Sequence, residues 1–289
     1  MKLFDAHSHW ATERGYPLRS KAALEKQEYT FKSRPAYVTE DEMAAAFRAA
    51  DAKVILDLGF TKSSPLAELR SYNDYAIETQ RAHGDVIFGN WIQIDPRLGE
   101  KGAQELERCI ATSSGFISAA VSAAGMGFPA SDPIYEPFYE VCAAAKRPVL
   151  ILVGYTGAGA GQRGGDGLQL DFCHPRHVDA VAARHADLDI IAGRPAWPWQ
   201  EEMIAILLHK ANVSCELHGW SPKHFTDSLK REIPRRLRKK VMFGADYPLL
   251  TYERLVGDWR NLGYEADVLD DVFRNNALRI FGGCNPRKD

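Results

Sequence analysis

The chain has 289 residues, of which 45% are hydrophobic and 26% charged, so it can bury a large core and fits one domain over residues 1–289. Its formal net charge of −2 gives no basic footprint for nucleic acid or for a membrane surface, so we expect small molecules or a second copy of the chain as partners. Five cysteines without a close pair, no secretion signal and no membrane-spanning apolar run favour a cytoplasmic protein without a disulfide framework.

Short β-rich runs alternate along the chain with segments of helical periodicity. We expect strands at 2–6, 53–59, 86–94, 116–121, 148–153, 188–192, 212–217 and 240–245. Thr39 and Glu42 have the spacing of a capping box that opens a helix over 43–50, and further helices are expected at 72–83, 100–111, 134–146, 175–186 and 198–210. This α/β alternation predicts a parallel sheet, and the closed (β/α)8 TIM barrel is its natural form at this length.

Two histidines, His7 and His9, end the first predicted strand, and Asp246 ends the last one. Side chains two residues apart on a strand share a face, so both imidazoles can converge on one point. Barrel closure would bring Asp246 beside them at the carboxyl ends of the strands, where such barrels carry their chemistry. The pattern therefore predicts an active site, although an isolated pair of this kind also occurs in polar loops and an aspartate can simply cap a segment.

Two stretches, 11–38 and 154–175, are longer than plain connections and follow the first and fifth predicted strands. Both would lie at the mouth of the barrel, where long loops serve as lids or binding walls. The second stretch is rich in glycine, but no lysine followed by serine or threonine succeeds it. A flexible loop is therefore favoured over a phosphate cradle.

Four further runs add to the histidine pair and the strand end around Asp246: 89–96 (GNWIQIDP), 154–157 (GYTG), 196–203 (AWPWQEEM) and 219–223 (GWSPK). With these motifs the chain resembles the amidohydrolase superfamily over nearly its whole length. The resemblance is to the branch that contains aminocarboxymuconate-semialdehyde decarboxylase, γ-resorcylate decarboxylase and pyrone dicarboxylate lactonase. It implies an amidohydrolase-type TIM barrel and a role in aromatic compound catabolism, and a homodimer is common in the branch.

The resemblance also implies a set of metal ligands that this chain matches only in part. In that branch zinc or manganese is commonly held by the histidine pair, a histidine ending the fifth strand and the aspartate ending the eighth, while a sixth-strand histidine does acid/base work. His7, His9 and Asp246 match the first and last elements. The fifth-strand position is Leu152 and the sixth-strand position is Arg194.

These replacements leave the cofactor open between a divalent metal and none. Two imidazoles and one carboxylate can still bind zinc or manganese at His7, His9 and Asp246. Arg194 acts against a dication because its guanidinium adds permanent positive charge, and it favours a bound carboxylate or oxyanion. The related lactonase is understood to work without metal, so a metal-free site also fits the branch.

His218 follows the seventh predicted strand and is the third candidate histidine. It could replace a ligand, act as general acid or base with Glu216 orienting it, or pack structurally beside a tryptophan. Tyr155, Trp91 and Trp197 are expected to line the substrate pocket, although aromatic residues near strand ends often belong to the core.

The leading hypothesis is a hydrolase of a small carboxylated or otherwise anionic cyclic substrate, such as a lactone or amide. In it Asp246 or His218 activates water, Arg194 holds the anion, and His7 with His9 either bind metal or polarise the carbonyl. A decarboxylase or hydratase of an aromatic or unsaturated acid is the alternative from the lyase class. A barrel that binds a small anion without turnover is the third.

Overall fold

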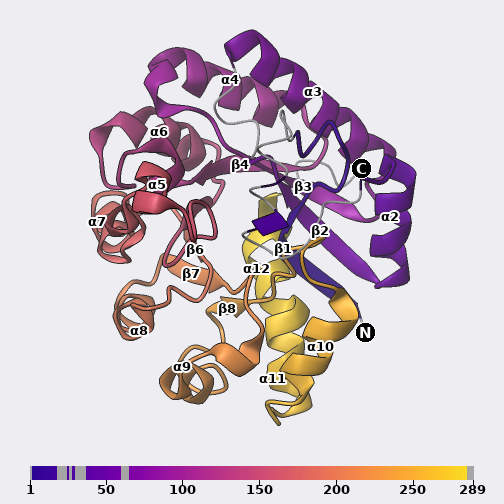
Figure 1. Cartoon of the computed structure of the whole chain (residues 1–289), viewed down its shortest axis with the longest axis vertical. Helices are drawn as coiled ribbons and strands as arrows, with labels where there is room; N and C mark the ends of the chain where they lie inside the picture. The colour runs from indigo at the N-terminus through magenta and orange to yellow at the C-terminus, as the bar shows by residue number, and fades with distance from the viewer. Residues whose placement is uncertain (1, 18–24, 26–27, 30–36, 60–64, 285–289) are drawn as a thin grey trace.

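The computed structural model describes residues 2–17, 25, 28–29, 37–59 and 65–284. Across these residues eight parallel strands pair in chain order, which confirms the predicted sheet. Helices surround the ring of strands (Figure 1). The strands are β1 (Leu3–His9), β2 (Ala52–Asp57), β3 (Ile87–Ile92), β4 (Phe116–Val121), β5 (Val149–Leu152), β6 (Ile190–Gly193), β7 (Val213–Glu216) and β8 (Val241–Met242).

The barrel closes between β1 and the segment that begins with β8. Ala6 N donates a hydrogen bond to Phe243 O at 2.9 Å, although regular pairing of β8 covers only Val241–Met242. The strand is shorter than expected because the following N–H groups have other acceptors: Phe243 N donates to Val272 O and Ala245 N to the carboxylate of Asp5, both at 2.9 Å. This closure confirms the predicted TIM barrel and places the carboxyl ends of β1 and β8 next to each other.

The helices that cover the barrel begin where local signals place them. The helices α2 (Glu40–Ala49), α3 (Leu66–Ala82), α4 (Gly99–Thr112), α6 (Glu136–Ala144), α7 (Arg176–Arg184) and α8 (Gln200–His209) fall on the predicted segments. Thr39 and Glu42 make both hydrogen bonds of the predicted capping box at the start of α2. Further helices were not predicted from the sequence: α5 (Ala123–Met126), α9 (Asp227–Glu232), α10 (Tyr252–Arg260), α11 (Ala266–Asp270), the π-helix Asp271–Asn275 and α12 (Asn276–Phe281).

Aromatic side chains fill the inside of the barrel near the amino ends of the strands. Phe4 and Phe116 are fully buried there, and α12 adds Phe281, whose ring stacks on Phe4 with centroids 5.7 Å apart. Trp91 comes from nearer the carboxyl end of β3, but its buried ring packs edge-on against Phe116 and Phe281. Figure 1 shows α12 reaching the middle of the ring of strands. The packed floor leaves the opposite end of the barrel, at the carboxyl ends of the strands, for a cavity.

Two long connections, 11–38 and 154–175, were expected at the mouth of the barrel. Most of the long stretch 11–38 lies outside the described residues. In the stretch 154–175 the chain forms two short 3-10 turns, Arg163–Gly167 and Leu170–Cys173, before α7. None of the helices in the described residues is long and apolar enough to cross a membrane.

Candidate active site

The carboxyl end of β1 places His7 and His9 beside each other. Their ring centroids are 5.2 Å apart with planes at 77°. His7 is completely buried, whereas His9 is partly exposed and lines a cavity of about 380 Å³. The structure therefore brings the two histidines together at the end of the barrel where the sequence places them.

Asp246 follows β8 and joins this pair through His9. Asp246 Oδ1 lies 3.1 Å from His9 Nε2. The backbone φ of Asp246 is 61°, outside the β region, so the extended strand conformation ends at this residue. Burial raises the pKa of Asp246, but the contact with His9 and the neighbouring imidazoles of His218 and His7 outweigh burial and hold the pKa well below its usual range. Asp246 is therefore ionised and in close polar contact with a histidine inside the cavity.

Asp57, at the end of β2, is a site residue that the sequence analysis missed. Its Oδ2 lies 3.5 Å from His7 Nε2 and 3.9 Å from His9 Nδ1. Gln93 Nε2 donates to both carboxylate oxygens, at 2.9 and 2.8 Å. The available signal was a carboxylate inside the otherwise apolar strand 53–59, which needs a polar partner once it is buried.

Glu216 on β7 contacts two imidazoles. His218 Nδ1 lies 2.6 Å from Glu216 Oε1, and His7 Nδ1 lies 3.2 Å from the same oxygen. The backbone N–H of His218 donates to Glu216 Oε2 at 3.0 Å. These contacts match the predicted orienting role of Glu216 toward His218, and they add a link to His7 that the sequence did not indicate.

Two glycines make room for this carboxylate. A Cβ on Gly244 would lie 2.6 Å from Glu216 Oε2, and a Cβ on Gly193 would lie 2.8 Å from Oε1. Any side chain at these positions would push Glu216 off the imidazoles. The glycines that end β6 and follow β8 thus fix the place of the carboxylate between its two partners.

The stacked rings of His7 and His218 have opposite pKa shifts. Their centroids are 3.6 Å apart with planes at 14°. Burial lowers the pKa of His218 to about 4 despite the charge of Glu216. Burial also acts to lower the pKa of His7, but the charge of Glu216 and the hydrogen bond with Asp57 outweigh it and raise that pKa to about 10. The cluster thus favours a neutral His218 beside a positively charged His7.

The cavity above this cluster combines one guanidinium with aromatic walls. Arg194, Tyr155 and Trp220 line it, and so does Leu152, the aliphatic residue at the fifth-strand position. Trp197 is 44% exposed and packs against Tyr155 and Trp220, with ring centroids 5.9 Å away in each case. Trp197 therefore extends the aromatic wall at the outer rim and does not line the cavity itself.

Trp91 was predicted from the sequence to line the substrate pocket, but it lies in the core. Its ring points into the packed floor of the barrel, where Nε1 donates to Ala6 O at 2.9 Å and the ring packs edge-on against Phe116. Trp91 is fully buried and does not line the cavity. The prediction that it contacts substrate is corrected because its side chain belongs to the core layer.

The donor set fits a divalent metal ion. Among the described residues two groups have ligand atoms within 4.8 Å of one another: His7, His9 and Asp57, and His7, Glu216 and His218. Both ring nitrogens of His7 are buried without a hydrogen bond of good geometry, and on loss of a proton one of them could coordinate a bound cation. Imidazole and carboxylate ligands suit zinc and manganese. Asp246 is in neither group, so its predicted role as ligand stays a prediction.

Comparisons with known proteins agree with this architecture. A family model described as amidohydrolase matches residues 4–283. No curated protein matches the chain significantly in sequence. Solved structures of similar fold include a 5-carboxyvanillate decarboxylase from Novosphingobium aromaticivorans complexed with manganese and 4-hydroxy-3-methoxy-5-nitrobenzoic acid, with a TM-score of 0.72, 14% identity and coverage of 97% of this chain and 96% of that one.

Two further structures extend the comparison. A 2,6-dihydroxybenzoate decarboxylase complexed with 2,6-dihydroxybenzoate has a TM-score of 0.69 and 15% identity, covering 98% of this chain and 99% of that one. An amidohydrolase from Burkholderia multivorans with bound zinc has a TM-score of 0.65 and 15% identity, with the same coverage of both chains. At these identities the likeness establishes a shared fold.

Proposed function

This chain belongs to the amidohydrolase family, and from that premise we propose that it hydrolyses a lactone, amide or related bond in a small carboxylated cyclic compound. The family match confirms the resemblance inferred from the motifs. The observation that carries the proposal is the hydrogen-bonded pair of Glu216 and His218 at the cavity. This pair has the form of a general base held by a carboxylate.

The direction of that hydrogen bond sets the role of His218. An ionised carboxylate only accepts hydrogen bonds, so Nδ1 of His218 carries the proton and Nε2 is left as a proton acceptor. In our proposal Nε2 removes a proton from a water molecule as that water attacks the substrate carbonyl. Asp246, ionised and in close polar contact with His9, is the second group that can accept a proton in the same cavity.

Arg194 and the aromatic wall support an anionic cyclic substrate. The described residues place no carboxylate oxygen within 4.0 Å of the Arg194 guanidinium, so its donors are available to a ligand. A guanidinium binds a carboxylate through two parallel hydrogen bonds. Tyr155 and Trp220 offer ring faces and edges against which a flat substrate can pack.

His7, His9 and Asp57 are the residues that would hold a divalent ion, with Asp246 as the predicted alternative carboxylate. Such an ion supplies Lewis-acid polarisation of a carbonyl and acidifies bound water. The proton transfers assigned above to His218 and Asp246 depend on these side chains' own hydrogen bonds. These proton transfers do not require a particular coordination geometry of the ion.

Decarboxylation of an aromatic acid is the second candidate. It is supported by the two decarboxylase structures of similar fold described above, each bound to a hydroxybenzoate-type ligand. Arg194 would serve this reaction as well, because the substrate is again a carboxylate. The two candidates differ in whether water or a proton adds to the substrate.

Isotope labelling separates the candidates. The full-length protein, with and without added zinc or manganese, is incubated with a panel of carboxylated lactones, anilides and hydroxybenzoates. Hydrolysis in ¹⁸O-labelled water places ¹⁸O in the product carboxylate. Decarboxylation in D₂O releases carbon dioxide and leaves deuterium on the carbon that lost it.

Three results would contradict these assignments. Carbon dioxide release with no ¹⁸O uptake would replace the hydrolase proposal by the decarboxylase candidate. Tight binding of a panel compound with no turnover under any metal condition would contradict both and favour a binding protein. A variant His218→Asn that retains full turnover would remove His218 from the mechanism.

A further inference from the structure

A second cavity, of about 420 Å³, lies at the amino-terminal end of the barrel and is separate from the active site. It begins at Lys2 and Leu3, which start β1, whereas His9 ends the same strand. Seven strand steps of roughly 3.3 Å separate Lys2 from His9, a distance of about 23 Å along the strand. The cavity falls within the range of about 300–1,000 Å³ that is typical of small-molecule sites.

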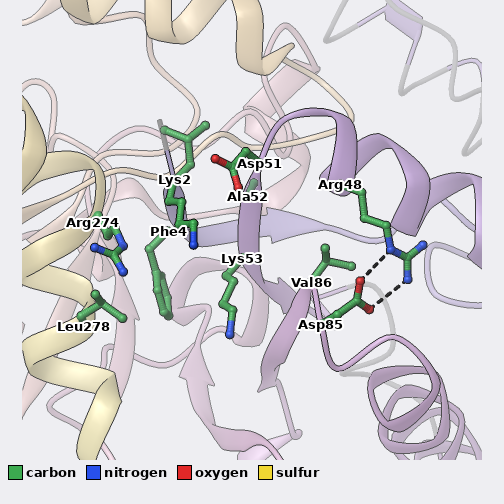
Figure 2. A pocket seen from close by; sticks show the side chains of 11 residues that line it. Lys2, Phe4, Arg48, Asp51, Ala52, Lys53, Asp85, Val86, Arg274 and Leu278 are labelled. Carbon is green, nitrogen blue, oxygen red and sulfur yellow. Dashed lines mark hydrogen bonds and ion pairs between the residues drawn. The ribbon is translucent and has the colours of Figure 1, made fainter.

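Besides Arg48, three cations from different parts of the chain line this cavity. Lys2 precedes β1, Lys53 lies on β2, and Arg274 comes from the π-helix near the carboxyl end of the chain. Phe4 pairs in register with Lys53, which sets that lysine beside the Phe4 ring. Figure 2 shows the side chains of Lys2, Lys53 and Arg274 grouped around Phe4.

The carboxylates of the cavity do not neutralise these three groups. Asp85 is engaged by Arg48 through two hydrogen bonds, of 2.6 and 2.9 Å (Figure 2). In the described parts of the chain no carboxylate oxygen lies within 4.0 Å of the charged nitrogens of Lys2, Lys53 or Arg274. Four cations and two carboxylates line the cavity, so its net charge is positive.

Apolar groups strengthen the field of these cations. Phe4 is 1% exposed and Leu278, one turn after Arg274, is 37% exposed at the cavity wall. A concave surface with low-dielectric walls and charges of one sign concentrates positive potential and attracts counter-ions. Like charges that line one cavity also repel one another, and a bound anion relieves that repulsion.

We propose that this cavity binds a small anion that carries a phosphoryl group with at least two negative charges. Two lysine ammonium groups provide point charges, and the planar guanidinium of Arg274 can donate two parallel hydrogen bonds to neighbouring phosphoryl oxygens. The ligand would join the start of β1, β2 and the carboxyl-terminal helices. Its binding is independent of the reaction at the other end of the barrel.

Calorimetric titration of the full-length, chelator-treated protein tests this site, with inorganic diphosphate and adenosine diphosphate as probes. We expect both probes to bind, with affinity that falls as salt is raised because exposed charges are screened. Tighter binding of the nucleotide would indicate a phosphorylated organic ligand, and tighter binding of diphosphate would indicate the free ion. Either probe should also raise the melting temperature of the protein.

Matched variants locate the binding. The double variant Lys53→Gln, Arg274→Gln should weaken diphosphate binding at least about tenfold, since two charge-assisted contacts are lost. Lys101→Gln removes an exposed lysine of α4 outside the cavity and should bind diphosphate as the unmodified protein does. Arg194→Gln, in the active-site cavity, should also leave diphosphate binding unchanged.

Three results would overturn the proposal. Absence of binding by both probes at low salt would show that the cavity does not recognise phosphoryl groups. Equal weakening in Lys101→Gln would show general attraction to surface charge. Loss of binding in Arg194→Gln, with none in the double variant, would place the anion in the active site.

Discussion

Glu216 is the residue on which the geometry of the active site depends most. It is fully buried and lies against both His7 and His218, with Gly193 and Gly244 leaving it space. Burial raises the pKa of Glu216, but the interactions with the His218 imidazole and with the positively charged His7 outweigh burial and hold the pKa far below its usual range. The carboxylate is therefore ionised at neutral pH.

The substitution Glu216→Gln tests the orienting role. Glutamine keeps the shape but removes the charge and can present an N–H to His218, which disfavours the required tautomer. We expect kcat to fall by about 10²–10⁴-fold with little change in KM. Steady-state kinetics on a panel substrate measures both. A variant with unchanged kcat would show that His218 needs no carboxylate.

Arg194 is expected to determine affinity for the substrate anion. In Arg194→Gln we predict that KM for a carboxylated substrate rises about 10–100-fold, because a charge-assisted bidentate contact contributes on the order of 1.5–3 kcal/mol. The methyl ester of the same substrate is the control, since it lacks the anion and should lose little. Equal loss with acid and ester would mean that Arg194 does not bind the carboxylate.

Asp5 is a buried carboxyl that joins β1 to the segment after β8. It accepts hydrogen bonds from four donors: His7 N at 3.1 Å, Ser8 Oγ at 2.6 Å, Ala245 N at 2.9 Å and Tyr252 Oη at 2.7 Å. Burial raises the pKa of Asp5 to about 6 in spite of these donors. The residue thus fixes the strand ends that carry His7 and Asp246.

The substitution Asp5→Asn should reduce the free energy of unfolding by about 2 kcal/mol. The asparagine NH₂ group would replace one carboxylate oxygen, so an N–H would face a donor that needs an acceptor. Tyr252→Phe removes one of the four hydrogen bonds and should cost about 1 kcal/mol. Urea unfolding followed by tryptophan fluorescence measures both values. An Asp5→Asn variant as stable as the unmodified protein would contradict the bridging role.

At the scale of elements, Glu105 links α4 to α3. Its carboxylate is buried and accepts hydrogen bonds from Asn73 Nδ2 at 2.8 Å, Arg70 Nε at 3.0 Å and both Nε and Nη2 of Arg108, at 2.9 and 2.8 Å. Burial acts to raise the pKa of Glu105, but these partners outweigh it and lower the pKa to about 2. The ionised form therefore stabilises the pairing of the two helices.

This link predicts a pH-dependent contribution to stability. A depressed folded-state pKa gives stability that is complete above the unfolded value of about 4.5 and is lost as pH falls toward about 2. We expect Glu105→Gln to lower the free energy of unfolding by about 2 kcal/mol near pH 7, and by clearly less near pH 3. Urea midpoints at the two pH values provide the comparison. A pH-independent difference would mean that the carboxylate charge is not responsible.

At the scale of the whole molecule, metal binding should stabilise the fold, because the donor groups come from strands that are far apart in sequence. Zinc at about 100 times its dissociation constant would add about 2.7 kcal/mol and raise the melting temperature by roughly 5 °C, and a strong chelator should reverse the rise. Differential scanning fluorimetry measures this change.

Variants identify the ligands in the same assay. His7→Ala should abolish the zinc-dependent rise, whereas His209→Ala, an exposed histidine at the end of α8, should retain it. Asp57→Asn compared with Asp246→Asn shows which carboxylate completes the site. A rise that persists in His7→Ala would contradict a metal site at the end of β1.

The sequence by itself determined the eight strands, their order and the barrel, because hydrophobic periodicity, capping residues and the handedness of parallel crossovers are local or general properties. It also placed His7, His9, Asp246 and His218 at one end of the barrel, since the carboxyl ends of parallel strands share an edge.

Only the tertiary structure decided which of the remaining side chains meet. The register shifts between β1 and β2 and again between β2 and β3, and a shift of one residue reverses which face of the sheet a side chain occupies. Asp57 and Trp91 are register partners that both face the barrel interior, but the Asp57 carboxylate reaches the histidines whereas the longer Trp91 ring packs against Phe116. The contact of Glu216 with His7, and the basic cavity shared by Lys2, Lys53 and Arg274, likewise depend on distances across the closed barrel that no local pattern encodes.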